Sequence, residues 1–328
     1  MTQELRKYEF LLEAVTPIAH HAETHGNMAL AFRRKIRQHD GSWAHVPYIT
    51  GDAMRHQLRE SIAYAFLDAA GLLDEGQLTE AALRLLFAGG MVTGRGDASS
   101  IKLDQYREMI ELIPALGLLG GCASNRVIEG RLTVDDALLV CHESARLLPE
   151  WVLREAYVLD TCRAHVTLEQ RVRMDPTLSP TKRKLLSAAD QVSVQTRLLA
   201  SEAAHDANDP VERDDTKSSM LPRSYETIAQ GSLFSWGVQA WTTSDLEYDT
   251  FCSMVGAFLS NARVGGKRAT GHGSLRAIKA FGVIVNRPSE RMDALDTTAL
   301  AGKIGSAFRA HVAERKERIV KFLREVDA

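Results

Sequence analysis

A glycine-rich segment with two cations has the residue types of an anion-binding loop. It reads Gly265-Gly266-Lys267-Arg268-Ala269-Thr270-Gly271-His272-Gly273. Because glycine has no Cβ, such a backbone turns tightly and approaches a ligand closely. Its N–H groups, together with the side chains of Lys267 and Arg268, suit a phosphate or a nucleic-acid backbone. The spacing matches neither the nucleotide P-loop nor the dinucleotide fingerprint, so a plain turn is an equal alternative.

Two further groups of cations lie nearer the N-terminus. Four of five consecutive residues are basic: Arg33, Arg34, Lys35 and Arg37. On an expected helix, Arg55 and Arg59 stand four residues apart and therefore project the same way. Charge runs often mark a solvated face, and that interpretation stays open for each group. If the groups meet along one groove, they would bind a phosphate backbone with an affinity that falls steeply with salt.

The composition limits the possible partners. The formal net charge of −2 argues against indiscriminate polyanion binding, but it leaves room for a local basic groove. Aromatic residues make up 6% of the chain, so we expect sparse base stacking and recognition that tolerates many sequences. No apolar run is long enough to cross a bilayer, so we expect no membrane partner. Four cysteines without a CxxC pair indicate reduced, mostly buried thiols in a cytoplasmic protein: Cys122, Cys141, Cys162 and Cys252.

Two sets of residues could support catalysis instead. His20, His21 and His25 could ligate a metal or cleave RNA by general acid–base chemistry, although no carboxylate or cysteine set completes a coordination shell. Three aspartates in or beside loops could hold a metal for a nuclease: Asp52, Asp97 and Asp104. Helix capping and turn formation explain these aspartates as well. Since no catalytic motif is recognisable, we expect a protein that is not an enzyme and that holds no metal or cofactor.

Hydrophobic periodicity predicts the elements that carry these residues. Residues 8–15 alternate as a half-buried strand, and residues 46–52 form a short extended piece closed by a turn. Thr50 or Asp52 would cap a helix over residues 53–70, where an apolar stripe recurs every four residues. The basic run and the helix that carries Arg55 and Arg59 therefore flank one short extended segment.

The middle of the chain divides into helical, strand-rich and polar stretches. Residues 79–119 are mainly helical, with Pro114 ending or kinking a helix. Residues 126–140 are rich in strands. Residues 171–217 are polar, contain three prolines and lack a clean apolar period, which favours a protruding insertion. Five of its cations could reach the same bound strand: Arg171, Arg173, Lys182, Arg183 and Lys184.

The C-terminal third returns to core material. Residues 234–240 alternate as a strand, and residues 251–262 carry the apolar face of a helix. The glycine-rich segment follows, then a strand to about residue 285 and an amphipathic helix over residues 300–326. A strand at each extreme of the core, with helices and a long insertion between, predicts one α+β domain with excursions.

Three motifs, in this order, carry a family resemblance that covers nearly the whole chain. They run from Val46 through Arg55 to Arg59, from Glu226 to Phe234, and over the glycine-rich segment. With them the chain resembles the repeat-associated mysterious protein superfamily, in particular the backbone subunit of class 1 CRISPR interference complexes. It is most similar to the type IV version of that subunit.

The resemblance implies a ferredoxin-like, RNA-recognition-type palm made by a single domain over residues 1–328. A helical finger-like insertion would cover about 70–125, and an extended thumb insertion about 165–220. Several copies would oligomerise along a CRISPR guide RNA, beside other subunits of the complex, and present the guide for pairing with target DNA or RNA. An endoribonuclease of the same superfamily, cutting guide precursor or target RNA, is the alternative. A phosphate-ligand enzyme that uses the glycine loop is a third hypothesis.

The resemblance also implies a set of RNA-binding residues. By matching position, Arg55 and Arg59 contact the guide backbone from the first palm helix. The loop over the guide is formed by Gly265, Gly266, Lys267, Arg268 and His272. With the basic run, the predicted set is Arg33, Arg34, Lys35, Arg37, Arg55, Arg59, Gly265, Gly266, Lys267, Arg268 and His272. No aspartate matches the cutting loop of some relatives, so we do not expect cleavage of target RNA.

Overall fold

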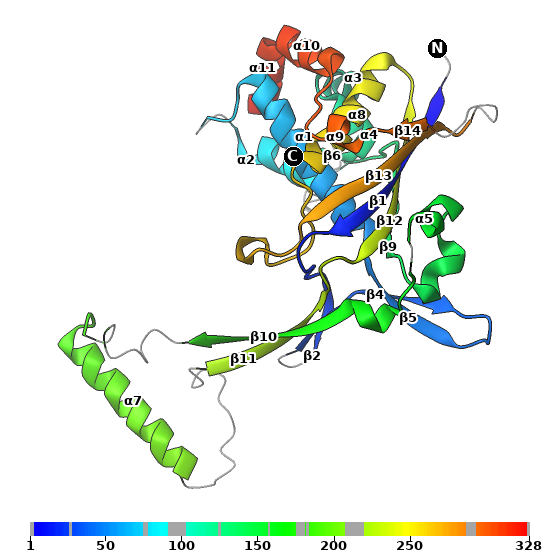
Figure 1. The fold of residues 1–328 in the computed structure, drawn as a ribbon. Coiled ribbons are helices and arrows are strands. Elements are labelled where there is room, and N and C mark those ends of the chain that lie inside the picture. Colours follow the sequence, from blue (N-terminus) through cyan, green and yellow to red (C-terminus); the bar gives the residue numbers. More distant parts are fainter. Residues whose placement is uncertain are drawn as a thin grey trace. The chain divides into compact units, whose positions relative to one another are not determined.

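The structure is a computed structural model. It describes residues 3–25, 28–74, 78–90, 103–123, 126–156, 158–174, 181, 184–206, 220–286 and 293–326. The chain divides into two compact units (Figure 1). The first comprises Met1–Ala22, Ala31–Thr167 and Thr227–Ala328, and the second comprises Glu23–Leu30 and Leu168–Glu226.

An antiparallel sheet forms the centre of the first unit. β1 (Glu4–Ala14) lies between β12 (Leu233–Thr242) and β13 (Leu275–Ile284). The strand order within the described residues is β14-β13-β1-β12-β9-β5-β4, and β8 also pairs with β12. The remaining strands are β4 (Arg33–Arg37), β5 (Trp43–Ile49), β8 (Leu132–Val134), β9 (Ala137–Leu139) and β14 (Asp293–Leu295). The chain is thus of the expected α+β class, and the strand predicted over residues 8–15 is confirmed.

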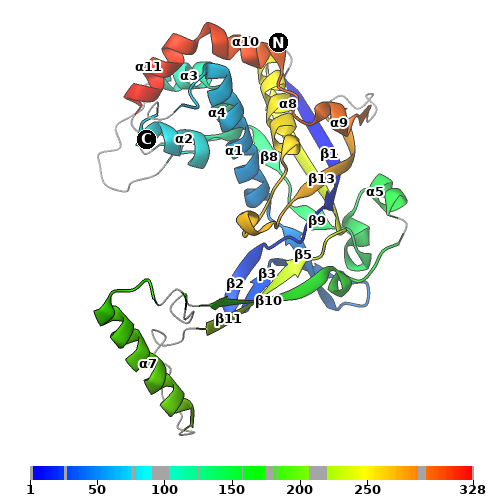
Figure 2. The same ribbon diagram turned by 60° about the vertical axis from the view of Figure 1, so that its left-hand side comes forward.

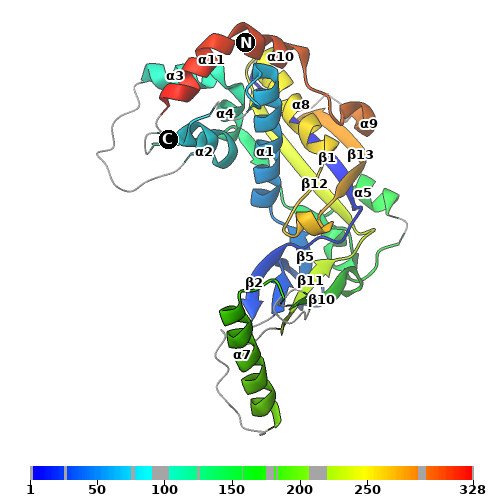
Figure 3. The ribbon, with the colours of Figure 1, turned by 90° about the vertical axis from the view of Figure 1, so that its left-hand side faces the viewer.

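One face of this sheet is covered by two helices, α1 (Gly51–Ala70) and α8 (Asp245–Ser260), which pack against each other (Figure 3). Alternate residues of β1 and β12 point into this layer, where the Phe10 ring stacks on Trp236 at 5.2 Å and Trp236 meets Phe258 at 5.6 Å. The stripe of α1 predicted from its four-residue period is buried as well: Met54, Leu58, Ile62 and Phe66. Side chains repeat every two residues along a strand and every 3.6 along a helix, so the apolar residues of each element fall on one face. The layer between the sheet and the helices therefore excludes water.

The opposite face of the sheet carries a smaller apolar cluster. Leu11, from the odd-numbered face of β1, packs there with Val152 of α5 (Glu150–Glu155). Trp151 donates its indole N–H to a Glu9 carboxylate oxygen at 3.0 Å, and its ring meets Phe281 at 4.9 Å. The sheet is therefore covered on both faces near its centre.

Shorter elements connect α1 to β8 and β9, the strands that pair with β12. They are α2 (Glu80–Ala88), α3 (Leu103–Leu112), α4 (Pro114–Leu119) and the hairpin of β6 (Gly121–Ala123) with β7 (Arg126–Ile128). A helix end at Pro114 was predicted, and α3 indeed stops just before it; Pro114 itself stands in the first turn of α4, where its missing N–H costs nothing. The strand-rich stretch expected over residues 126–140 corresponds to β7, β8 and β9.

The C-terminal segment differs from the single amphipathic helix that we expected. It forms α9 (Thr297–Leu300), α10 (Ser306–Glu314) and α11 (Lys316–Glu325). Gly302 takes a left-handed φ of 75°, which stops α9. The approach of Gly305 to α8 leaves no room for a Cβ, since one would lie 1.9 Å from a carboxylate oxygen of Asp249. The apolar pattern continues across these breaks, because Phe308 and Val312 of α10 and Ile319 and Leu323 of α11 are all buried.

Among its described residues, the second unit contains a four-stranded sheet and a long helix (Figure 2). Its strand order is β10-β11-β3-β2, formed by β10 (Val166–Met174), β11 (Met220–Ile228), β3 (Met28–Ala31) and β2 (His21–His25). The helix is α7 (Ala188–Asp206). Residues 23–30, which the sequence did not connect with the insertion, thus belong with residues 168–226 in one unit.

Two smaller predictions concern thiols and membranes. The four cysteines are free, and Cys122, Cys141 and Cys162 are buried, as expected. Among the described helices, none combines the length and the apolar character that a bilayer crossing requires.

Candidate nucleic-acid interface

The start of α1 is held by residues 15–20, which follow β1 and which we call the post-β1 segment. Thr50 is the N-cap, and its hydroxyl accepts from the Ala53 N–H at 3.3 Å. The Thr50 N–H in turn donates to Nε2 of His20 at 3.2 Å, and the His20 ring lies 4.6 Å from that of Phe32. Burial, with a smaller contribution from His21, lowers the pKa of His20 to about 4. His20 is therefore a neutral acceptor near neutral pH, and one whose Nε2 is already occupied.

The glycine-rich segment is an ordered loop between α8 and β13, as the sequence predicted, and it docks on the same post-β1 segment. Gly266 donates its N–H to the Ala19 carbonyl at 2.7 Å, and Gly273 donates to the Pro17 carbonyl at 2.9 Å. Gly265 has a φ of 74°, and a Cβ there would lie 2.5 Å from the Ala19 oxygen, so only glycine fits. The loop is thus held in place by tertiary hydrogen bonds as well as by its own turn.

The backbone of this loop bonds mostly within the protein. A 3-10 turn, η4 (Arg268–Thr270), fills its centre, and Lys267 precedes it with a φ of 59°. The Lys267 carbonyl accepts from the N–H of Thr270 at 2.9 Å and of His272 at 3.4 Å. Because several N–H groups are used in this way, an anion would meet the side chains of the loop more than its backbone. A left-handed non-glycine residue is a form of strain that often marks functional loops.

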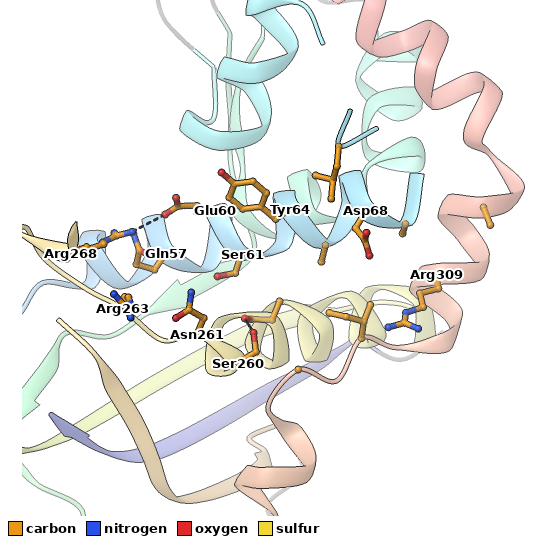
Figure 4. Close-up of a pocket in the computed structure, with 17 residues that line it drawn as sticks. Gln57, Glu60, Ser61, Tyr64, Asp68, Ser260, Asn261, Arg263, Arg268 and Arg309 are labelled. Atoms are coloured by element: carbon orange, nitrogen blue, oxygen red, sulfur yellow. Dashed lines mark hydrogen bonds and ion pairs between the residues drawn. The ribbon is translucent and has the colours of Figure 1, made fainter. Parts of the chain in front are cut away.

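The two cations of the loop have different surroundings. Lys267 is exposed, whereas Arg268 turns back onto α1 and pairs with the Glu60 carboxylate at 3.3 Å (Figure 4). This pair stands at one end of a groove of about 710 Å³ between α1, α8 and α10. Two further arginines and one aspartate line it, namely Arg263, Arg309 and Asp68. His272, also in the predicted set, is buried at 5% exposure.

The two arginines of α1 converge, as their spacing predicted, but they converge on the interior. Nη2 of Arg59 donates to the Gly120 carbonyl at 2.9 Å and to that of Leu119 at 3.2 Å. Arg55 donates to Leu119 as well, and to the Leu132 carbonyl at 2.8 Å. Leu119 and Gly120 form the C-terminal end of α4, where the last carbonyls have no helical donor, and Leu132 begins β8.

The burial of Arg59 disfavours its charged form. Its side chain is 8% exposed, and burial, followed by the neighbouring Arg55 charge, lowers its pKa to about 10. The carbonyl bonds offset this penalty by stabilising the charged form. A backbone-stabilising role is therefore evident for both arginines, while their contact with a guide strand stays a prediction.

The basic run of residues 33–37 forms β4, and its two faces differ. β4 pairs antiparallel with β5 in a hairpin whose turn is held by the Gln38 N–H to the Ser42 carbonyl at 2.8 Å. On the inner face, Ile36 is buried, and Arg34 forms an ion pair with Asp136 while its guanidinium lies 5.0 Å from the Tyr48 ring. Asp136 also accepts from the Gly51 N–H at 2.6 Å, so Arg34 is tied to the start of α1.

The other face of the hairpin, which we call the outer face, presents Lys35, Arg37, Trp43 and His45. Register places Lys35 opposite His45 and Arg37 opposite Trp43. All four side chains are exposed, Trp43 at 60%. Within the described part of the chain, no ion pair engages either Lys35 or Arg37. Arg33 lies on the same side of β4 but is only half-exposed.

Sequence reasoning overlooked Trp43 and His45. It began the extended segment at Val46 and did not connect it with the basic run. The Asp40-Gly41 pair between the two was the available signal, because such dipeptides favour hairpin turns.

The structure therefore brings together three of the predicted segments through the post-β1 segment. Ala19 bridges to Gly266, His20 contacts Thr50 at the start of α1, and the His20 carbonyl accepts from Phe32, next to β4, at 3.0 Å. Four of the five cations predicted on the insertion have no described side chain. Lys182 and Arg183 lie outside the described residues, as do the side chains of Arg171 and Arg173.

The residues of the catalytic alternatives are described only in part. Asp97 lies outside the described residues, as do the side chains of Asp104 and His25, while Asp52 stands in the first turn of α1. Where the structure describes the chain, no three His, Cys, Asp or Glu side chains are placed to hold a metal ion together.

Comparison with known proteins gives a likeness in fold. No known family and no curated protein matches the chain by sequence. A solved chain of a type IV-B CRISPR complex matches with a TM-score of 0.50 and 17% identity, covering 87% of this chain and 92% of that one. Thermofilum pendens Csc2 gives a TM-score of 0.44 and 11% identity, covering 98% and 90%. The chain therefore has the fold of a subunit of a type IV-B CRISPR complex, which confirms at the level of the fold the resemblance stated from its sequence.

Proposed function

We propose that this protein is a non-enzymatic subunit of a class 1 CRISPR interference complex that binds guide RNA. The observation that carries the proposal is the likeness to a chain of a type IV-B CRISPR complex, because it extends over nearly the full length of both chains. Copies of the protein would assemble along the guide, beside other subunits, and present it for pairing with target DNA or RNA.

The topology of the first unit supports a ferredoxin-like palm. Its central strands lie in the sheet order β13-β1-β12-β8 and occur along the chain as β1, β8, β12 and β13. Of the two helices on one face, α1 follows β1 along the chain and α8 follows β12. That is the β-α-β-β-α-β arrangement of RNA-recognition domains. In this proposal the second unit serves as the thumb, and α2 to α4 belong to the finger-like insertion.

The charges of the first unit support recognition of the guide backbone. Lys35 and Arg37 on the outer face, and Lys267 on the glycine loop, are exposed cations on elements that the post-β1 segment joins. Gly265 and Gly266 would let the loop stay close to that segment, and His272 would support the loop from inside. Arg33 and Arg268 flank these cations. Such contacts read no bases, so guides of many sequences would bind equally.

Purification of the protein with a guide-encoding array tests the proposal. We expect multisubunit particles that retain RNA of defined length, and no cleavage of added RNA. A nucleic-acid-free monomer with high ribonuclease activity would refute the proposal and favour the endoribonuclease alternative. In that case His21→Ala tests a catalytic histidine.

A matched pair of variants tests the site itself. Lys267→Ala should release RNA at lower salt than the wild type, whatever the guide sequence. Arg154→Ala removes the same charge from an exposed i,i+4 pair with Glu150 on α5, and should leave RNA retention unchanged. Equal retention by both variants would argue against the glycine loop as a backbone contact, and a sequence-selective loss would argue against backbone recognition.

A further inference from the structure

We propose that the outer face of the β4–β5 hairpin is a stacking site for an unpaired base, with Trp43 as the platform and Lys35 and Arg37 as phosphate contacts. The inference rests on the proposed function, since it assigns part of the bound strand to this face. It departs from the expectation of sparse stacking, which considered only the low aromatic content of the chain.

The exposure of Trp43 is the first observation. Its side chain is 60% exposed, although burial of so large an apolar ring is normally favourable. Trp236, by comparison, is 1% exposed and stacks on Phe10, and Trp151 packs on Phe281. Among the described residues, no ring or cation is stacked on Trp43. Folding of the chain therefore leaves an indole available for a ligand.

The second observation is the placement of the cations. Arg37 of β4 is the direct cross-strand neighbour of Trp43 on β5, and Lys35 lies two residues before Arg37 on β4. Side chains two apart on a strand share a face and stand about 6.8 Å from each other. This interval resembles that between successive phosphates of an extended nucleic-acid strand, so base and backbone can be bound at once.

The hairpin is also rigid enough to hold such a site. Asp40 accepts from the Ser42 N–H at 2.9 Å and from its hydroxyl at 2.7 Å, which closes the turn, and Gly41 takes a φ of 85°. On the inner face, the Arg34–Asp136 pair and buried Ile36 fix β4 to the core. A site that is already ordered loses little entropy when it binds.

These features favour a single-stranded nucleic acid over an acidic peptide. Both ligands would satisfy Lys35 and Arg37, but a peptide of carboxylates would leave the indole in water. Every base has a π-face, and exposed aromatics on a sheet are a common platform for unpaired bases. The strand could belong to the guide or to the target, because both offer the same chemistry.

Fluorescence titration of the full chain, stripped of RNA in high salt, tests the inference. The probes are short oligouridine RNA and oligothymidine DNA. We expect quenching of tryptophan fluorescence by either probe. In Trp43→Ala the affinity should fall about tenfold or more, in line with the measured contribution of base–aromatic stacking. Trp43→Phe should keep most of the affinity and lose most of the quenching. Trp241→Phe, on partly exposed Trp241, is the matched control and should change neither.

Salt dependence separates stacking from charge. Trp43→Ala should weaken binding without changing the slope of affinity against salt, whereas loss of Lys35 and Arg37 should reduce that slope. In the assembled particle, Trp43 fluorescence that is already quenched identifies the guide as the occupant. Quenching that appears only on addition of a complementary strand identifies the target.

Two results would overturn the inference while the proposed function stands. One is a Trp43→Ala chain that is quenched and binds like the wild type, in particles that still carry RNA. The other is unchanged oligonucleotide affinity with shortened particles, which would make the outer face a contact between subunits. Wild-type particles without RNA would refute the proposed function itself.

Discussion

The arginines of α1 and the cations of the β4–β5 hairpin are alike in the sequence, but the fold treats them in opposite ways. Arg59 is 8% exposed and binds carbonyls at the C-terminal end of α4. Lys35 and Arg37 are exposed on the outer face, with no ion-pair partner in the described part of the chain. The first pair bonds to the protein's own backbone, whereas the second pair has no such partner among the described residues.

The difference teaches how to separate structural from functional charge. A buried guanidinium is costly, so it persists only where acceptors offset the cost, and its removal leaves those acceptors unpaired. An exposed cation contributes little to stability and can be lost without unfolding the protein. Free cations gathered on one face therefore indicate a ligand more strongly than the number of cations does.

The largest expected effect is on stability, from the buried side of the comparison. Arg59→Ala should lower the free energy of unfolding by about 2–4 kcal/mol, because the Gly120 carbonyl loses its donor and a void remains. Arg37→Ala, a matched exposed change, should stay within about 0.5 kcal/mol of the wild type. Urea unfolding measures both. The comparison breaks if Arg59→Ala is as stable as the wild type but releases RNA.

The second effect extends the contrast to histidines and to pH. Burial lowers the pKa of His20 from near 6.5 to about 4, so the unfolded chain binds a proton there more readily than the folded one. Stability from this site is full above about pH 6.5 and is lost as the pH falls toward 4, by on the order of 2 kcal/mol. His20→Gln should flatten that part of the unfolding profile. A slope in His20→Gln that equals the wild type's would show that this pH dependence comes from other groups.

The third effect is on binding, from the exposed side. A Lys35→Ala/Arg37→Ala chain should bind RNA about tenfold more weakly near physiological salt, or about 1.4 kcal/mol. Two lost phosphate contacts on a single strand should also reduce the salt slope by about 1.4. Arg34→Ala, on the inner face of the same strand, is the control and should change the slope less. Equal slopes for the two would show that the faces do not differ.

The smallest effect concerns a cation between the two extremes. Arg268 is partly exposed and pairs with Glu60. Glu60→Gln should change stability by less than about 1 kcal/mol and strengthen RNA binding two- to threefold, because a nearby negative charge is removed. Glu80→Gln breaks a more exposed pair, with Arg84, and should leave RNA binding unchanged. A weaker-binding Glu60→Gln chain would show that the pair positions Arg268 for the ligand.

Much of the fold could be read from local patterns. The alternation of β1 and the four-residue stripe of α1 predicted both elements to within a few residues, and Thr50 was correctly named as a possible cap. The C-terminal helices were merged into one, because their apolar pattern continues across breaks that depend on the approach of Gly305 to Asp249. Such a contact joins distant residues and leaves no local signal.

The candidate site was less predictable for the same reason. Spacing on a helix showed that Arg55 and Arg59 point one way, yet it could not show that the carbonyls of Leu119 and Gly120 lie there. The glycines of the loop suggested a cradle, whereas the tertiary structure uses Gly265 to bring the loop against Ala19.

The sequence by itself determined the α+β class, the order of the main elements, and the family that the chain resembles, because periodicity and short motifs are local properties. Tertiary structure alone decided which cations are buried and which reach solvent. That choice depends on pairing between β4 and β5 and on the packing of α4 against α1, and desolvation makes its energetic consequences large. Trp43 became a candidate only through its cross-strand neighbour.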